Sequence, residues 1–249
     1  MEAAVRRAGL VGMIDHEFRF FPARTRMHEL IQEAYLGDLH LLHIYAIGGF
    51  RADPARPWNW WSSLGEAGGH LGALGSHYID STRRWFGEIS SVLGQLDTVV
   101  KERPVPGSGE MRPVDADDGF TLLMRLASGA RVSVVATAVA HAPAGNRFEA
   151  YGTRGTLIID RQERLWGAPA GASAPEELPI PPDILSRFGD YPANSPVGAF
   201  VQLVDVFVRG IRGGTTVAPS FVDGLRVQET MEAAHRSHAE RRWVDLPLP

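Results

Sequence analysis

The alternation of hydrophobic and polar positions divides this chain into a helical beginning, a β-rich middle and a helical end. Residues 22–37 open after a turn at Pro22, close at Gly37 and carry apolar residues at the i, i+3, i+4, i+7 spacing of an amphipathic helix. Those apolar residues are Met27, Leu30, Ile31 and Ala34. Residues 39–50 alternate as a strand does. Before them, residues 4–9 resemble the end of a helix, with Gly9 at the C-cap, and residues 10–14 a strand.

A β pattern begins at Ser90 and runs to about residue 160. In LASGAR, a Ser-Gly turn separates two alternating runs, and YGTRGTL repeats this arrangement with another glycine-bearing connection. Successive hairpins of this kind predict a largely antiparallel sheet.

The last third of the chain predicts two helices and a short closing strand. Residues 167–196 are rich in Pro, Ala and Gly and are typical of a mobile loop. A helical stripe follows in residues 197–213, a second helix begins at Pro219 or Ser220, and residues 241–247 form a strand.

These elements predict an α+β fold: a large, mainly antiparallel open sheet with helices on one face, preceded by a short remnant of a βα unit. The other sheet face would carry the alternating apolar residues of VSVVATAVA, residues 132–140. A sheet face without a helical cover predicts burial against a second copy, so we expect a homo-oligomer, a dimer or tetramer.

Composition narrows the possible partners. The 249 residues include 25 basic and 29 acidic side chains with no sustained run of either sign, which argues against nucleic acid and anionic membrane surfaces. The chain has no cysteine, which excludes disulfides, thiolate catalysis and cysteine-bound zinc. No apolar run approaches the roughly 18 residues of a membrane helix. We expect a cytoplasmic protein with a small-molecule substrate.

The stretch GGHLGALGSHYID, residues 68–80, concentrates glycine and histidine in a segment with helical periodicity. Leu71, Leu74, Tyr78 and Trp85 form its apolar stripe, while His70, Ala73, His77, Asp80 and Arg84 fall on the opposite side. Each glycine inside a helix costs roughly 0.5–1 kcal/mol relative to alanine. We therefore expect another group to approach the backbone closely at Gly72 and Gly75.

His77 is the side chain of this helix best suited to proton transfer near neutral pH. Asp80, at i+3, is close enough to orient its imidazole. The structural alternative is that His77 satisfies a buried polar group and Asp80 pairs with Arg84. His70 and His77 are two turns apart, about 10 Å along the axis, so the sequence predicts no metal site here.

Three further positions are candidates for ligand contact. Arg19 follows a strand end and would contact a phosphate, carboxylate or substrate hydroxyl, or instead form a salt bridge with an acidic neighbour. Trp58, Trp60 and Trp61 would stack on a sugar ring or nicotinamide edge, or form a hydrophobic plug of their loop. Asp117 and Asp118 are interpreted as turn residues.

Four segments together resemble one known family. HEFRFFPA, the G-G-x-L-x-x-L-G-x-H-x-x-D run, EAYGTRGTLIID and DGLRVQETMEAAHRSHAERRWVDL are similar to the C-terminal domain of the Gfo/Idh/MocA oxidoreductases. The resemblance implies an N-terminal Rossmann domain, of which residues 1–15 would be the end, and a substrate-binding and oligomerisation domain over residues 16–249. It implies hydride transfer between NAD or NADP and a sugar, inositol or related polyol.

The resemblance assigns roles to individual residues. His77 matches a catalytic-site histidine and Arg19 an arginine near cofactor and substrate, which makes Trp58, Trp60 and Asp80 candidate substrate contacts and Gly72 a candidate cofactor contact. The family often has an aspartate four residues before the histidine, and here that position is Ala73.

The chain also differs from the family in having no GxGxxG fingerprint and no Glu-Lys-Pro motif. We therefore expect the chain to resemble a truncated member and to bind no dinucleotide alone. The alternative hypothesis is a non-catalytic binding or scaffolding protein that self-associates through its open sheet.

Overall fold

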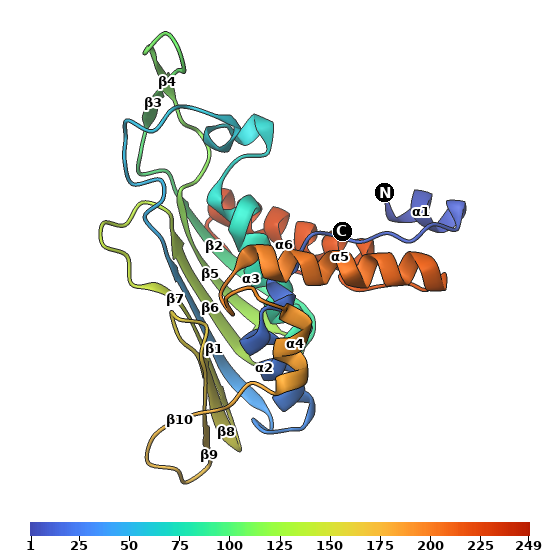
Figure 1. The fold of residues 1–249 in the computed structure, drawn as a ribbon. Coiled ribbons are helices and arrows are strands. Elements are labelled where there is room, and N and C mark those ends of the chain that lie inside the picture. Colours follow the sequence, from blue (N-terminus) through green and yellow to red (C-terminus); the bar gives the residue numbers. More distant parts are fainter.

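A nine-stranded sheet is the largest element of the computed structural model, which describes residues 1–249. Its strand order is β10-β9-β8-β7-β1-β6-β5-β2-β11 (Figure 1). All neighbours run antiparallel except β1 (Leu39–Ile47) and β6 (Arg131–Thr137), which are parallel. The other strands are β2 Ile89–Asp97, β5 Gly119–Leu126, β7 Gly145–Gly152, β8 Gly155–Ile159, β9 Leu165–Pro169, β10 Glu176–Glu177 and β11 Val244–Asp245. A separate hairpin, β3 (Glu102–Pro104) and β4 (Met111–Pro113), extends from one end.

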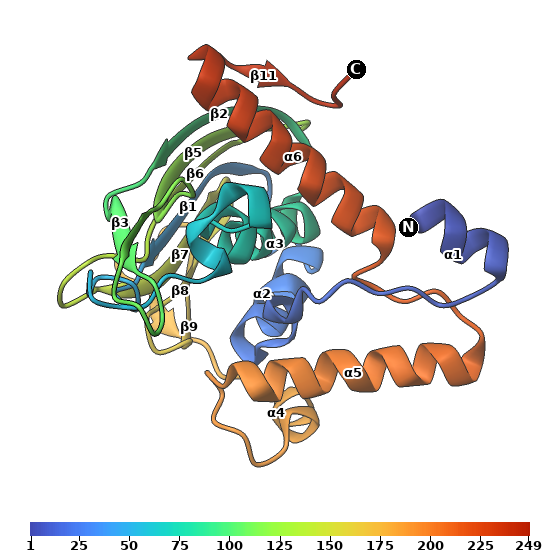
Figure 2. The same cartoon turned by 90° about the horizontal axis from the view of Figure 1, so that it is seen from above.

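The helices lie on one face of this sheet, so the predicted α+β architecture is confirmed (Figures 1 and 2). Closest to the sheet are α2 (Pro22–Gln32), α3 (Ser76–Phe86) and α6 (Phe221–Glu240). The long helix α5 (Pro196–Gly213) packs against α4 (Pro182–Phe188) and the short 3-10 turn Glu17–Phe20. The first helix, α1 (Glu2–Ala8), ends at Gly9 in the left-handed conformation, as predicted, and buries none of its residues.

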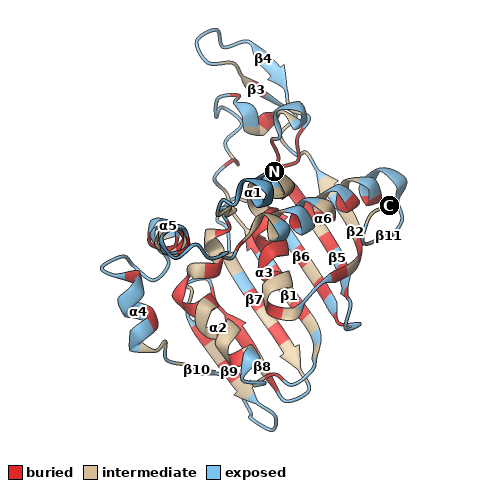
Figure 3. Ribbon diagram, turned by 90° about the vertical axis from the view of Figure 1, so that its right-hand side faces the viewer, coloured by how far each residue is buried: buried red, intermediate tan, exposed pale blue.

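The core fills the space between the sheet and the three inner helices (Figure 3). Alternation along each strand decides which side chains enter it, because successive residues point to opposite faces. On β5, Phe120, Leu122 and Met124 point inward and are almost completely buried. Tyr45, Leu123 and Val135 point to the opposite, uncovered face and are exposed. The sheet therefore has one packed face and one open face.

Two segments differ from their sequence predictions. Residues 10–14 are extended but form no strand, because their backbone pairs with no neighbouring strand. Ile14 N–H instead donates to the carbonyl of Pro219 in the loop before α6. Within residues 167–196, expected to be a loop, the structure has the edge strand β10 and the helix α4. Buried Ile184 and Phe188 anchor α4, and apolar residues at that spacing are a helix signal.

None of the helices combines the length and the apolarity that a membrane crossing requires.

Candidate functional site

The glycine- and histidine-rich stretch begins as a wide π-helical turn, Leu71–Gly75, and continues without a break as α3. Asp117, just before β5, holds the start of the turn: its carboxylate accepts from the Leu71 N–H at 2.8 Å. The predicted apolar stripe is confirmed, with Leu71, Tyr78 and Trp85 buried in the core. The opposite side of the helix therefore faces α6 and the turn Glu17–Phe20, both of which α3 contacts.

The two interior glycines of this turn have different surroundings. A Cβ at Gly75 would lie 2.8 Å from Leu71 Cδ1 and 2.9 Å from Phe120 Cζ, so the close approach expected there is made by the sheet. Gly72 is exposed, and a Cβ there would have only the Ala67 carbonyl, 3.9 Å away, within reach. No group of the chain itself therefore approaches Gly72 closely, and the space beside its backbone is open to a ligand.

His77 lies in the first turn of α3 with its ring held between aromatic neighbours. Phe18 stacks on the imidazole with ring centroids 4.1 Å apart, and His16 meets it edge-on at 5.4 Å. The Nδ1 atom is buried and makes no hydrogen bond, and Glu17 Oε2 lies 3.5 Å from it. The residues around His77 thus come from one short turn, 16–18, that precedes α2.

Burial sets the protonation of this pair. Burial, together with the neighbouring His16 and Arg24, lowers the pKa of His77 to about 3. It raises the pKa of Glu17 to about 7, with nearby Asp15 adding to the effect and Arg24 opposing it. At neutral pH the imidazole is therefore uncharged, while the Glu17 carboxyl is close to its midpoint.

Arg19 and Asp80 face each other in a buried ion pair. Arg19 Nε donates to Asp80 Oδ2 at 2.6 Å and Nη2 donates to Oδ1 at 2.5 Å, and Nη2 also donates to Asp223 of α6 at 3.0 Å. Of the two alternatives for Arg19, the salt bridge is present. Its Nη1 makes no protein hydrogen bond.

The expected orienting role of Asp80 is wrong, because both of its carboxylate oxygens accept from Arg19 rather than from His77. Its partner is also not Arg84, the pairing given by the structural alternative. Arg84 lies nearby with its Nε buried and unpaired, and burial together with Arg19 lowers its pKa to about 10.

The tryptophans lie in the loop between β1 and the π-helical turn. Trp58 is largely buried: its Nε1 donates to the Pro113 carbonyl at 3.1 Å, and the Arg112 guanidinium covers its ring. Trp58 therefore holds the β3–β4 hairpin against the loop. This agrees with the alternative that the tryptophans form a hydrophobic plug of their loop. Trp60 is 49% exposed and meets Trp61 edge-on. Neither Trp58 nor Trp60 makes a ring contact or hydrogen bond with His77.

Sequence reasoning missed two titratable groups around this site, His16 and Glu17, and interpreted a third, Asp117, only as a turn residue. Burial raises the pKa of Asp117 to about 6 against the opposing hydrogen bond from Leu71, so this residue, interpreted from the sequence as a turn residue, is a buried group that holds the π-helical turn. His16 and Glu17 belong to HEFRF, where charged residues alternate with phenylalanines. That mixture is the sequence signal for buried polar groups, but it does not reveal that they surround a helix sixty residues away. No cluster of His, Cys, Asp or Glu has an arrangement that could hold a metal ion.

Comparison with known sequences gives consistent matches. A model of the GFO/IDH/MocA C-terminal domain matches residues 25–158. An uncharacterised oxidoreductase of Synechocystis is 32% identical over 94% of this chain and 64% of its own length. Levoglucosan dehydrogenase of Pseudarthrobacter phenanthrenivorans is 30% identical over 99% of this chain and 70% of its own length. This chain thus spans about two thirds of these relatives.

Solved structures show the same fold. Levoglucosan dehydrogenase in complex with NADH and L-sorbose has a TM-score of 0.90 at 30% identity, covering 99% of this chain and 69% of that one. Its complex with NADH and levoglucosan has a TM-score of 0.89 at 29% identity over the same shares of the two chains.

Proposed function

Since the chain belongs to the Gfo/Idh/MocA family, we propose that it is the substrate-binding and oligomerisation part of an NAD(P)-dependent oxidoreductase acting on a sugar, inositol or related polyol. The observation that carries the proposal is His77: a neutral imidazole, fixed by Phe18 and His16, beside a turn whose Gly72 leaves open space. The NADH and sugar bound to levoglucosan dehydrogenase support the classes of cofactor and substrate.

In this proposal His77 exchanges a proton with a substrate hydroxyl. A neutral imidazole has one nitrogen with a free lone pair, and burial keeps His77 in that state at neutral pH. Of its two nitrogens, Nδ1 is turned to Glu17, which leaves Nε2 for the substrate. When bound, the dinucleotide supplies the hydride acceptor or donor.

The remaining candidate residues position these groups. We propose that Nη1 of Arg19, the donor that Asp80 and Asp223 leave free, contacts substrate or cofactor, and that Asp80 contributes by holding Arg19 in place. The open backbone at Gly72 suits the close approach of a flat cofactor ring. Trp60, half exposed on its loop, is the tryptophan free to stack on a sugar, while the buried Trp58 supports that loop.

We also propose that residues 1–15 belong with the dinucleotide-binding unit and residues 16–249 with the substrate unit. This division is supported by α1, none of whose side chains is buried, and by the unpaired extended segment after it. The chain carries no Gly-x-Gly-x-x-Gly fingerprint, so the cofactor's phosphates would be held by that other unit.

The proposal is tested in an enzyme in which this chain follows a dinucleotide-binding domain. Oxidation of levoglucosan, inositol or a related polyol is measured as NADH or NADPH formation. We expect His77→Gln to lower kcat by about 10²- to 10⁴-fold, because glutamine keeps the polar shape but cannot accept a proton.

Two controls accompany this measurement. The chain alone should form no NADH, and His141→Gln, at an exposed position, should keep the wild-type rate. An unchanged kcat for His77→Gln would refute the assignment of His77.

The open sheet face favours one alternative, a non-catalytic protein that pairs with itself or a relative. Tyr45, Leu123 and Val135 lie exposed on that face, which no helix covers (Figure 1). The two proposals share the prediction of self-association and differ in whether His77 supports turnover.

A further inference from the structure

A carboxyl group and an imidazole face each other across the short turn that precedes α2. Glu17 Oε2 lies 3.5 Å from His77 Nδ1, at the outer limit of a hydrogen bond. The two side chains are only 16% and 11% exposed, so water screens their interaction weakly. That Nδ1 is buried and makes no hydrogen bond to any other group of the protein.

The neighbours of this pair restrict both groups. Phe18 stacks on the imidazole with only 28° between the ring planes, and His16 stands nearly perpendicular to it. Because His16, Glu17 and Phe18 are consecutive residues of one turn, the turn that fixes the ring plane also carries the carboxyl toward Nδ1. The contact is therefore built into the local fold.

Burial makes the carboxyl the group that titrates near neutrality, and the charges around the pair modify this effect. Asp15 on the same segment and Arg24 on α2 act on Glu17, while His16 and Arg24 act on His77. Arg24 is itself engaged by Glu163, which accepts from it at 2.6 Å. Burial moves the two pKa values in opposite directions, to about 7 for Glu17 and about 3 for His77. A proton held by this pair near pH 7 therefore resides on the carboxyl.

We propose that Glu17 is the far end of a proton relay, and that it receives through His77 the proton released by the substrate hydroxyl. The inference rests on the proposed oxidoreductase function. As the hydroxyl O–H bond breaks, its proton binds His77 Nε2, and the proton on Nδ1 moves to Glu17 Oε2. The hydride leaves the same carbon for the nicotinamide of the dinucleotide, so the alcohol becomes a carbonyl and the imidazole stays neutral.

The relay also explains how the site works with alanine at position 73, one turn before His77. Alanine cannot hold a proton, and Asp80 is occupied by Arg19. Glu17 is thus the carboxyl that remains within reach of the imidazole.

The test follows the tautomer of His77 in the full chain by ¹⁵N NMR of the imidazole nitrogens, with the signals assigned by their loss in His77→Gln. Below pH 7, a protonated Glu17 donates to Nδ1 and the ring proton sits on Nε2. Above pH 7, the Glu17 carboxylate accepts from Nδ1–H and Nε2 becomes the bare nitrogen. We expect the two ¹⁵N shifts to exchange character with a midpoint of about pH 7.

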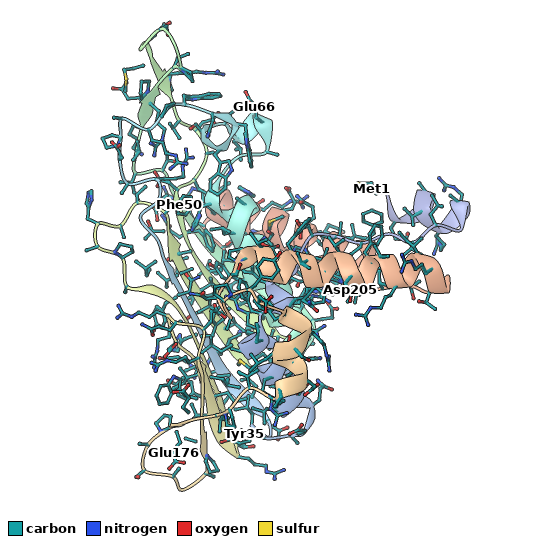
Figure 4. The ribbon with its side chains drawn as sticks, viewed as in Figure 1. Met1, Tyr35, Phe50, Glu66, Glu176 and Asp205 are labelled. Carbon is teal, nitrogen blue, oxygen red and sulfur yellow. The ribbon has the colours of Figure 1, made fainter.

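Glu17→Gln keeps the shape of the side chain but removes the titrating carboxyl, so the exchange should disappear. Glu66→Gln is the matched control, because Glu66 is exposed on the loop before the π-helical turn (Figure 4) and should leave the exchange unchanged. A wild-type spectrum without a change near pH 7, or an exchange that persists in Glu17→Gln, would overturn the relay without reference to any variant's activity.

Kinetics separate this inference from the proposed function. In the complete enzyme, kcat/KM for alcohol oxidation should rise through about pH 7 and for carbonyl reduction should fall, since oxidation needs the carboxylate and reduction the carboxyl. Glu17→Gln should remove both inflections and lower the oxidation rate on the order of 10²-fold. If His77→Gln abolishes turnover while Glu17→Gln keeps the wild-type pH profile, the relay is wrong and the oxidoreductase stands. If neither variant changes turnover, the assignment of His77 to proton transfer fails together with the relay, and a wild-type enzyme that forms no NADH or NADPH would refute the oxidoreductase function itself.

Discussion

Buried histidines are the most pronounced feature of this molecule at the scale of single residues. Burial lowers the pKa of His16, His28, His70 and His77 below the ordinary value of 6.5. All four imidazoles are therefore mainly uncharged in the folded chain at pH 7. His70 is the simplest case, because it is 2% exposed, neither ring nitrogen has a partner, and the nearby Arg51 adds to the effect. Protonation of these rings is therefore linked to unfolding.

We predict that His70 makes the fold sensitive to acid. The pKa of His70 is about 4 in the folded chain against an ordinary value of 6.5. Between pH 4 and pH 6.5 the unfolded chain therefore binds a proton at His70 that the folded chain does not. The stability that neutral His70 contributes is present above pH 6.5 and is lost as the pH falls toward 4. The free energy of unfolding, measured with urea, should fall between pH 7 and pH 5 in the wild-type chain. In His70→Gln this fall should be smaller by about 2 kcal/mol.

The control is His141→Gln, an exposed position, which should keep the wild-type difference between the two pH values. Equal differences in wild type and His70→Gln would show that His70 is not the group responsible. Measuring the difference between pH values removes any constant cost of the substitution itself.

At the scale of elements, the two glycines of the π-helical turn before α3 have different roles. Gly75 packs against Phe120 of the sheet, whereas Gly72 lies in the open on the other side of the turn. Gly75 lets the turn approach the core, and Gly72 keeps a stretch of backbone uncovered in the turn that leads into α3 and His77.

The two positions should respond in opposite ways to alanine. Gly75→Ala forces a methyl group against Leu71 and Phe120 and should lower the free energy of unfolding by about 1–3 kcal/mol. Gly72→Ala meets no such obstacle and should raise it by about 0.5–1 kcal/mol, the ordinary helix preference for alanine. Urea unfolding of both variants measures this, and a destabilising Gly72→Ala would show that the turn needs glycine there for its own backbone.

Local pattern predicts most elements but not the contacts between distant ones. The stripe of α3, the hairpin β5–β6 and the start of α6 next to Ser220 could be predicted because each depends on neighbours in the sequence. The strand expected at residues 10–14 is absent because a strand also needs a partner, which the local sequence does not specify.

The site shows the same limit. His77 is predicted as a site residue from its position on a glycine-rich helix and from the family resemblance. Glu17 and the Arg19–Asp80 pair are not, because the residues of each contact are about sixty positions apart. Only the packing of α3 against the turn 17–20 brings them together.

At the scale of the whole molecule, the uncovered sheet face is the exposed apolar surface best suited to bind a partner. Tyr45 lies directly beside Val135 across the β1–β6 pair, and Leu123 lies on the same face of β5. Exposed apolar side chains gathered over several neighbouring strands are typical of an interface rather than of a free surface. We propose that a second copy of the chain covers them.

Light scattering of the purified chain at micromolar concentration should give the mass of a dimer or tetramer. Val135→Lys places a charge in the middle of that face, where burial without a partner is costly, and should shift the mass to that of the monomer. Leu185→Lys, an equally exposed apolar position on α4, is the matched control and should leave the mass unchanged. A monomeric wild-type chain would contradict the interface and with it the scaffolding alternative.

The single parallel pair at the centre of the sheet has a consequence for the order of assembly. Strand β1 is synthesised before both of its neighbours, β6 and β7, which follow it by about ninety or more residues. Pairings of such long sequence separation form slowly, because a long loop must close before any hydrogen bond is gained. Until residue 137 has been made, nascent β1 has two open edges, and one edge stays open until residue 152 has been made, so this interval is when the chain most needs protection from aggregation.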